Sequence, residues 1–225
     1  MDLRKSHPPS LSPQGLAIAG WSAFAVAASL FLVISWNLDA ATPLVLLDAK
    51  VAAWLHARAT PGLTSVVLAV THLNSTVAIS AFSVAFGVVL ARMREWYWML
   101  TLALAVSGGL ALNALLKLAY ERKRPHFDEP LVTLATYSFP SGHTAGAVLF
   151  YGVLAAFLVS RLYDRRRRIA CVAAAVAAIV LVAFSRIYLG AHYLSDVLAA
   201  ACSSTAWLVL CLSAVHRLVR RRMES

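Results

Sequence analysis

The sequence predicts an all-α integral membrane protein, a polytopic bundle of six transmembrane helices with both termini in the cytoplasm. Three observations lead to this prediction. Of the 225 residues, 60% are hydrophobic and only 13% are charged, whereas soluble domains carry about 25% charged residues. Six long stretches contain no Asp, Glu, Lys or Arg, and most of the basic residues flank one side of these stretches.

Each uncharged stretch is long enough to cross a bilayer as a helix. A span needs roughly 17–25 predominantly apolar residues, and a helix satisfies its own backbone hydrogen bonds in lipid. The first stretch exceeds the roughly 7–15 apolar residues of a cleaved signal peptide, so we expect it to remain as an anchor. In chain order the stretches are Leu16–Trp36, Leu63–Ala91, Trp96–Leu116, Thr144–Ser160, Ile169–Ser185 and Val197–Val215.

The chain is expected to form a cytoplasmic tail over residues 1–15 and a single transmembrane domain over residues 16–222. Between the first two spans, a short helix over Asp48–Arg58 is expected on the outer surface. The longest polar connection, Ala119–Pro140, joins the third and fourth spans. A brief connection over residues 186–196 joins the last two spans.

The basic residues set the predicted orientation. Thirteen of the 20 Lys and Arg lie on the side of the termini, and seven lie on the opposite side. Because short loops rich in Lys and Arg stay in the cytoplasm, the termini and the run Arg165–Arg168 are predicted to be cytoplasmic. Binding of anionic lipid headgroups by this run is possible, although topology alone explains it. The net charge of +10 does not indicate nucleic-acid binding, since no aromatic-studded basic surface accompanies it.

Three clusters of chemistry-bearing residues remain outside the spans, and the predicted topology brings them all to the outer side. They occupy residues 117–125, 140–143 and 185–196. Lys117, Arg124 and Arg186 place three cations at outer helix ends, where they repel one another unless an anion joins them. Arginine grips phosphate oxygens with a planar fork of donors, so the bound anion is predicted to be a phosphate.

The second cluster is typical of a helix start. Ser141 is a favourable N-cap residue, and Gly142 allows a ligand to approach the backbone. Free N–H groups at a helix N-terminus bind anions such as phosphate. His143 would then lie in the first turn, beside the anion.

The third cluster contains His192 and Asp196, which are four residues apart and would share one face of a helix. A carboxylate that holds one imidazole nitrogen fixes the tautomer and leaves the other nitrogen as base or nucleophile. Together these residues fit phosphoryl transfer. His192 would attack phosphorus, the cations would stabilise the oxygens, and His143 would protonate the leaving oxygen and later activate water.

Each cluster also has a simpler explanation. Lys117 and Arg124 are able to snorkel at the membrane border, and a His–Asp pair is often only a structural hydrogen bond. The joint occurrence of all three clusters, on one side, favours a catalytic site. A transporter would place its charges in the middle of the spans, and a purely structural membrane protein would not need two histidines and three cations on one face.

The ordered pattern Lys-x6-Arg-Pro, Pro-Ser-Gly-His and Ser-Arg-x5-His-x3-Asp resembles the type 2 phosphatidic acid phosphatase superfamily, and every motif position is matched. The resemblance implies that His192 is the nucleophile, Asp196 its orienting partner and His143 the general acid. It also implies that no metal or cofactor is needed. The superfamily's vanadate-binding haloperoxidases are mostly soluble, which argues against that branch. The residues that the resemblance assigns to phosphate binding are Lys117, Arg124, Ser141, Gly142 and Arg186.

The expected function is hydrolysis of a lipid phosphate or diphosphate at the outer face of a bacterial inner (plasma) membrane. Relatives of this size act on undecaprenyl diphosphate, phosphatidylglycerol phosphate or phosphatidic acid. Undecaprenyl diphosphate is the favoured substrate, because an outer-face site suits the release of that carrier. A lipid phosphotransferase would use the same catalytic residues and remains an alternative.

A few polar or reactive residues lie within the predicted spans. For Thr71, His72 and Asn74, interhelical hydrogen bonding is favoured over a role along the substrate path. The cysteines are expected to be small buried apolar side chains rather than disulfide or metal ligands. They are Cys171, Cys202 and Cys211.

Overall fold

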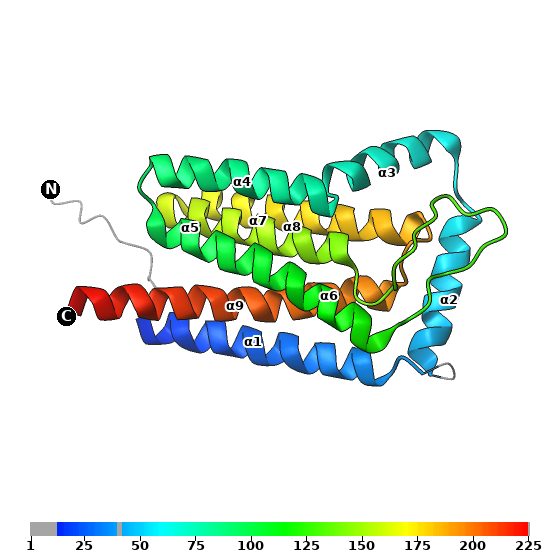
Figure 1. The fold of residues 1–225 in the computed structure, drawn as a ribbon, viewed down its shortest axis with the longest axis horizontal. Helices are drawn as coiled ribbons and strands as arrows, with labels where there is room; N and C mark the ends of the chain where they lie inside the picture. Colours follow the sequence, from blue (N-terminus) through cyan, green and yellow to red (C-terminus); the bar gives the residue numbers. More distant parts are fainter. Residues whose placement is uncertain (1–12, 40–41, 225) are drawn as a thin grey trace, which may run out of the picture.

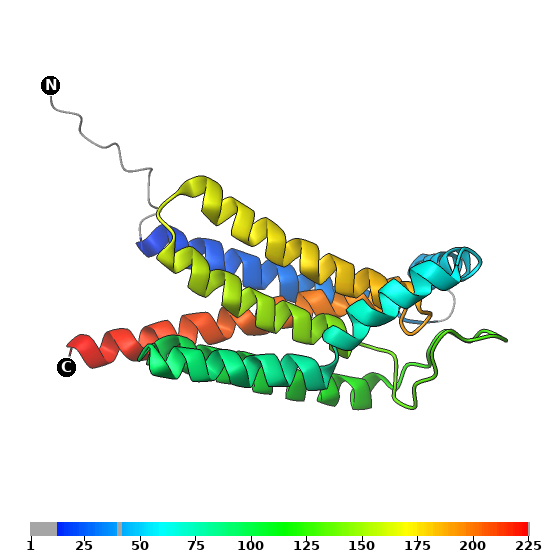
Figure 2. The same cartoon turned by 90° about the horizontal axis from the view of Figure 1, so that it is seen from above.

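The structure, a computed structural model, describes residues 13–39 and 42–224. Over these residues it is an elongated helical bundle without strands (Figures 1 and 2), so the predicted all-α class is confirmed. By length and composition five helices are able to cross a membrane, or six if the bent pair α3 and α4 counts as one span. Most of the predicted tail, residues 1–15, lies outside the described part of the chain.

Every uncharged stretch is helical apart from one break in the second, and the helices run past the ends of several stretches. The elements are α1 (Pro13–Trp36), α2 (Pro43–His56), α3 (Pro61–Leu73), α4 (Thr76–Arg92), α5 (Trp96–Ala103), the π-helical turn η1 (Leu104–Gly108), α6 (Gly109–Tyr120), α7 (Gly142–Arg161), α8 (Arg165–Tyr188) and α9 (Leu194–Glu224).

Helix α7 occupies the centre of the bundle, where it contacts α4, α6, α8 and α9. Its residues 144–150 are all buried. Leu149 and Val153 of α7 pack with Ile79 of α4 in the main apolar core. Helix α1 lies alongside α9 (Figure 1). Because lipid tails are as apolar as leucine, such helices associate chiefly through close packing and interhelical hydrogen bonds.

The second predicted span is not one continuous helix. It breaks at Asn74 and Ser75 into α3 and α4, which are bent by 47°. The Ser75 hydroxyl caps α4 by accepting from the Ala78 N–H at 3.2 Å, and Asn74 accepts from the Tyr151 hydroxyl of α7 at 2.9 Å. The predicted interhelical hydrogen bonding is therefore confirmed for Asn74, whereas His72 is exposed on the other side of the break.

The third span is interrupted by a π-helical turn, η1, which packs against α9. Trp207 of α9 lies so close that a Cβ on Gly108 would be 2.5 Å from its ring. The Trp207 indole donates a hydrogen bond to the Leu104 carbonyl at 3.2 Å. Beyond this turn α6 continues to Tyr120, so Lys117 lies in its last turn, at a helix end as predicted.

One end of the bundle carries most of the basic helix termini. The α4–α5 turn, the α7–α8 turn and the C-terminal part of α9 meet there (Figure 1). The run Arg165–Arg168 forms the first turn of α8, capped by Asp164. That this end faces the cytoplasm stays a prediction.

The opposite end is crossed by α2 (Figure 1). The short helix predicted over Asp48–Arg58 is present, but it begins earlier, at Pro43, and ends at His56. Thr42 caps it and Pro43 occupies its first turn, a combination that favours helix initiation. The connections 121–141 and 189–193 lie at this same end, which we call the outer end. The three cysteines are free, and only Cys211 is buried.

Candidate active site

The three sequence clusters meet at the outer end of the bundle. Six elements or connections contribute the eight predicted site residues. These are Lys117 at the end of α6, Arg124 in the connection 121–141, Ser141, Gly142 and His143 at the start of α7, Arg186 near the end of α8, His192 in the connection 189–193 and Asp196 in the first turn of α9.

His192 does not lie on a helix with Asp196, as the spacing suggested, but in the turn that precedes α9. Gly190 allows the turn through its left-handed φ of 65°, and the His192 N–H donates to the Arg186 carbonyl at 3.2 Å. A Cβ added to Gly190 would lie only 2.8 Å from the Phe127 ring, so a larger residue would also clash here. The turn still brings His192 Nδ1 to 3.5 Å from Asp196 Oδ2.

The hydrogen bonds around His192 distinguish its two ring nitrogens. Nδ1 faces Asp196, whose Oδ2 also accepts from the Ser138 hydroxyl and from the Tyr193 N–H at 2.9 Å. Nε2 lies 3.3 Å from Nη1 of Arg124. This network assigns the proton to Nδ1 and leaves the Nε2 lone pair on the side of Arg124.

Burial keeps His192 neutral. Only 2% of its surface is exposed, and this desolvation is the main reason that its pKa falls to about 4. Asp196 opposes the shift, while Arg124 and Arg186 add to it. The ring is therefore uncharged at neutral pH and one of its nitrogens carries no proton, as a nucleophile requires.

The lowered pKa of His192 predicts a pH-dependent stability. Between pH 6.5 and about 4 the unfolded chain takes up a proton that the folded chain does not, so stability falls as the pH drops through this window. We expect the Tm in detergent to fall more steeply from pH 7 to pH 5 for the wild type than for His192→Gln. His126→Gln, which alters an exposed histidine, should keep the wild-type slope. Parallel curves for the wild type and His192→Gln would contradict a neutral, buried His192.

Backbone carbonyls hold two of the cations in place. Lys117 Nζ donates to the Tyr137 carbonyl at 2.6 Å. Arg124 donates through Nε to the Thr136 carbonyl at 2.6 Å and through Nη1 to the Ala191 carbonyl. Burial lowers the pKa of Arg124, against the opposing charge of Asp196. Since no carboxylate is hydrogen-bonded to either cation in the described chain, both positive charges remain available to an anion.

Arg186 is the most deeply buried of the three cations, with 3% of its surface exposed. Its Nη1 donates to the Thr71 hydroxyl at 2.5 Å, which confirms interhelical hydrogen bonding for Thr71. Its Nε is buried and has no hydrogen-bond partner within the described chain. A buried donor without a partner costs free energy, and a phosphate oxygen would satisfy it.

The start of α7 supplies the remaining predicted residues. The Ser141 hydroxyl caps the helix by accepting from the Thr144 N–H at 3.5 Å, as predicted. A Cβ on Gly142 would lie 3.4 Å from Oδ1 of Asn113, so the backbone runs close to α6. His143 lies in the first turn and interacts electrostatically with Arg186, His192 and Arg124.

Sequence reasoning missed three residues of the site, Asp48, Arg122 and Ser138. Arg122 forms ion pairs with both Asp48 and Asp196. Burial would lower the pKa of Arg122, but the two carboxylates outweigh it and raise the pKa. The one available signal was Asp48 itself, an acidic residue that follows the apolar run Leu44–Leu47.

Comparisons with known proteins agree with this architecture. The PAP2 superfamily pattern matches residues 96–220. Phosphatidylglycerophosphatase B of Bacillus subtilis (strain 168) is 37% identical over 140 residues, which cover 61% of this chain and 68% of the relative.

Two solved structures are also similar to this chain. The crystal structure of a transmembrane PAP2 type phosphatidylglycerolphosphate phosphatase from Bacillus subtilis has a TM-score of 0.76 and 29% identity, covering 88% of this chain and 96% of that chain. The structure of LpxE from Aquifex aeolicus has a TM-score of 0.61 and 22% identity, covering 74% of this chain and 95% of that one, and so shows a shared fold. From the family match and the relative at 37% identity, we conclude that the chain belongs to the PAP2 superfamily.

Proposed function

We propose that the chain is a metal-independent lipid phosphatase that works through a phosphohistidine on His192. One observation carries the proposal. Arg124 lies 3.3 Å from the unprotonated nitrogen of a neutral histidine, Arg186 interacts electrostatically with this histidine, and Lys117 interacts with both arginines. The buried Nε of Arg186 has no partner among the described residues. This arrangement suits a tetrahedral anion whose phosphorus lies next to Nε2 of His192.

The reaction proceeds in two transfers. In the first, Nε2 of His192 forms a bond to phosphorus while the bond from phosphorus to the leaving oxygen breaks, and His143 donates a proton to that oxygen. In the second, a water oxygen attacks phosphorus, the nitrogen–phosphorus bond breaks and His143 accepts the water proton. Asp196 stabilises the positive charge that develops on the His192 ring in the first transfer.

The phosphate-binding groups are Lys117, Arg124 and Arg186, with the N-terminal turn of α7 at Ser141 and Gly142. They stabilise the equatorial oxygens, on which negative charge is concentrated during transfer. Their side chains supply the positive charge that a divalent metal supplies in other phosphatases. No group of three His, Cys, Asp or Glu side chains suited to a metal lies within residues 13–39 and 42–224.

The site is proposed to lie at the outer face of a bacterial plasma membrane, with the lipid tail of the substrate in the bilayer. The distribution of basic residues supports this orientation. Two substrates deserve priority. The relatives from Bacillus subtilis carry the name of a phosphatidylglycerol phosphate phosphatase, which favours that monoester. An outer-face site also suits undecaprenyl diphosphate.

The test is release of inorganic phosphate by the purified protein in detergent. Phosphatidylglycerol phosphate, undecaprenyl diphosphate and phosphatidic acid are compared, each with and without EDTA. We expect release that survives EDTA and that is fastest with one of the first two lipids. Presenting the lipid in the outer leaflet of sealed right-side-out vesicles tests the orientation, because phosphate should then accumulate outside the vesicles.

Other results would change the proposal in defined ways. Loss of activity in EDTA that returns with a divalent metal would overturn metal independence. Turnover that requires a second lipid as acceptor, with the phosphate recovered on that lipid, would identify a phosphotransferase. Absence of turnover with all three lipids would contradict the proposed substrate class.

A further inference from the structure

A second group of charged and polar residues lies next to Asp196, on the side away from His192. It consists of Asp48 from α2, Arg122 from the connection 121–141 and Ser195 from α9. The side chains of Asp48 and Asp196 are fully buried, and the Arg122 side chain is 11% exposed. Two buried carboxylates therefore share one guanidinium, an arrangement that is costly unless each charge is paired and hydrogen-bonded.

Arg122 bridges the two carboxylates with separate nitrogens. Nη1 donates to Asp196 Oδ1 at 2.6 Å, and Nη2 donates to Asp48 Oδ2 at 2.8 Å. The guanidinium also stacks on the Tyr193 ring, 4.4 Å from its centroid. Its position is thus fixed by two ion pairs and one aromatic face.

Asp48 is held in turn by α9. Its Oδ1 accepts from the Ser195 N–H at 2.9 Å, and its Oδ2 accepts from the Ser195 hydroxyl. Arg122 Nη1 also contacts the Ser195 hydroxyl at 2.7 Å. The surface helix α2 is therefore connected to the start of α9 next to the residue that orients His192.

The two oxygens of Asp196 have different partners. Oδ2 faces His192, Ser138 and the Tyr193 N–H, whereas Oδ1 accepts from Arg122. Without Arg122, Oδ1 would lose its charged partner, and only the Ser138 hydroxyl and the Tyr193 N–H on Oδ2 would oppose rotation of the carboxylate about its Cβ–Cγ bond. The contact between Oδ2 and Nδ1 of His192 is 3.5 Å long, so even a small rotation of the carboxylate would break it.

We propose that Arg122 is a positioning residue for the phosphatase reaction, which, bridged to Asp48, holds Asp196 in the orientation that His192 requires. This inference rests on the proposed function of the site. The fork of the guanidinium is essential to it, because an ammonium group is a single point of charge and does not span two carboxylates in the same way.

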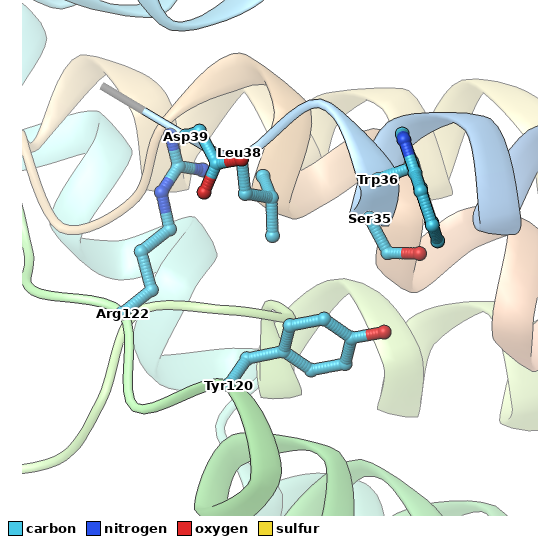
Figure 3. A pocket seen from close by; sticks show the side chains of 6 residues that line it. All are labelled: Ser35, Trp36, Leu38, Asp39, Tyr120 and Arg122. Carbon is cyan, nitrogen blue, oxygen red and sulfur yellow. The ribbon is translucent and has the colours of Figure 1, made fainter.

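The surroundings of Arg122 add a second reason. Its side chain forms one side of an outer-end pocket of about 580 Å³, opposite Ser35 and Trp36 and next to Tyr120 (Figure 3). Since Arg122 both lines this pocket and hydrogen-bonds to Asp196, we expect a shorter side chain to open a path for water to the carboxylate. Water would compete for the oxygens that now face Arg122 and His192.

A merely structural role for the bridge makes a different prediction. In that case Arg122 would serve only to neutralise two buried carboxylates, and removing one of them would restore both stability and activity. The positioning role requires Arg122 even after the charge on Asp48 has been removed. The combination of Arg122→Gln with Asp48→Asn separates these possibilities.

The experiment compares wild type, Arg122→Lys, Arg122→Gln, Asp48→Asn and the double variant, with Lys123→Gln as the matched control. Lys123 is an exposed cation in the same connection, so its replacement removes the same charge without touching Asp196. For each protein we would measure Tm in detergent, kcat and KM for phosphate release, and the affinity for vanadate. Vanadate mimics the transferred phosphoryl group and reports on His192 independently of the lipid.

We expect Arg122→Gln and Arg122→Lys to lower kcat about 10–100-fold with little change in KM, the range typical for loss of a partner that orients a catalytic ligand. Vanadate binding should weaken by a similar factor. The double variant should regain Tm relative to Arg122→Gln while its kcat stays low. Lys123→Gln should match the wild type in all three measurements.

A double variant whose kcat recovers together with its Tm would overturn the positioning role, as would a normal kcat in Arg122→Gln. Both outcomes leave the proposed function intact, because the wild type is active in the same assay. A wild type that neither releases phosphate nor binds vanadate would overturn the proposed function, and the inference with it.

Discussion

Replacing His192 with alanine should abolish phosphate release, lowering kcat by about 10⁴-fold or more, as expected when the nucleophile of a cooperating set is removed. The physical reason is that no other nitrogen in the site has both a free lone pair and a carboxylate behind it. Nε2 of His192 lies 3.3 Å from the Arg124 guanidinium and Nδ1 faces Asp196. Release is measured with the best lipid of the panel, in the same detergent for both proteins.

A trapping experiment makes the prediction more specific. Brief incubation with a lipid whose transferred phosphate is radioactive, followed by quenching in base, should leave label on the wild type, because phosphohistidine survives base and is lost in acid. His192→Ala should carry no label. His126→Ala, which alters an exposed histidine in the connection 121–141, should retain both label and turnover. Label that persists in His192→Ala would place the nucleophile elsewhere.

The second large effect is expected for His143→Gln, and it should depend on the leaving group. Cleavage of phosphatidylglycerol phosphate expels a basic alkoxide that needs a proton. Cleavage of undecaprenyl diphosphate expels a phosphate, whose second pKa is about 6. Loss of the general acid should therefore slow the first transfer about 10²–10⁴-fold for the monoester, and much less for the diphosphate.

The measurement is a single turnover that follows release of the dephosphorylated lipid, because this step precedes the water attack in which His143 also takes part. His216→Gln is the matched control, since His216 is an exposed histidine on α9. It should leave both substrates unaffected. Equal slowing of the two substrates would mean that His143 does not protonate the leaving group.

The membrane spans were predictable from the sequence because uncharged stretches and helices coincide in lipid. An uncharged stretch underestimates the length of a helix that continues past a charged residue. Lys117 and Arg186 both lie inside the last turns of their helices, since each reaches polar partners at the outer end. The break at Asn74 and Ser75 also escaped prediction, because average hydropathy does not register a serine cap in the middle of an apolar stretch.

The gathering of the three motifs at one end was also predictable, because the parity of the spans places their loops together. The ion pairs of Arg122 with Asp48 and Asp196, which hold the motif residues in place, were not predictable. Arg122 and Asp48 are 74 residues apart in the sequence, and only the packing of α2 across the outer end brings them together. Likewise, the spacing of His192 and Asp196 suggested a shared helix face, whereas a turn at Gly190 produces their contact.

The break between α3 and α4 has a consequence for protein engineering. Helix α4 crosses the bundle beside α7, while α3, only 13 residues long, brings Thr71 to Arg186. The Tyr188 hydroxyl ties α3 to α8 by accepting from the Thr60 N–H at 3.1 Å. Because the bend separates the two helices, substitutions within α3 would change how Thr71 holds Arg186 without altering α4, which packs beside α7. This short helix is therefore the place where the contacts of one buried arginine can be varied while the apolar core stays intact.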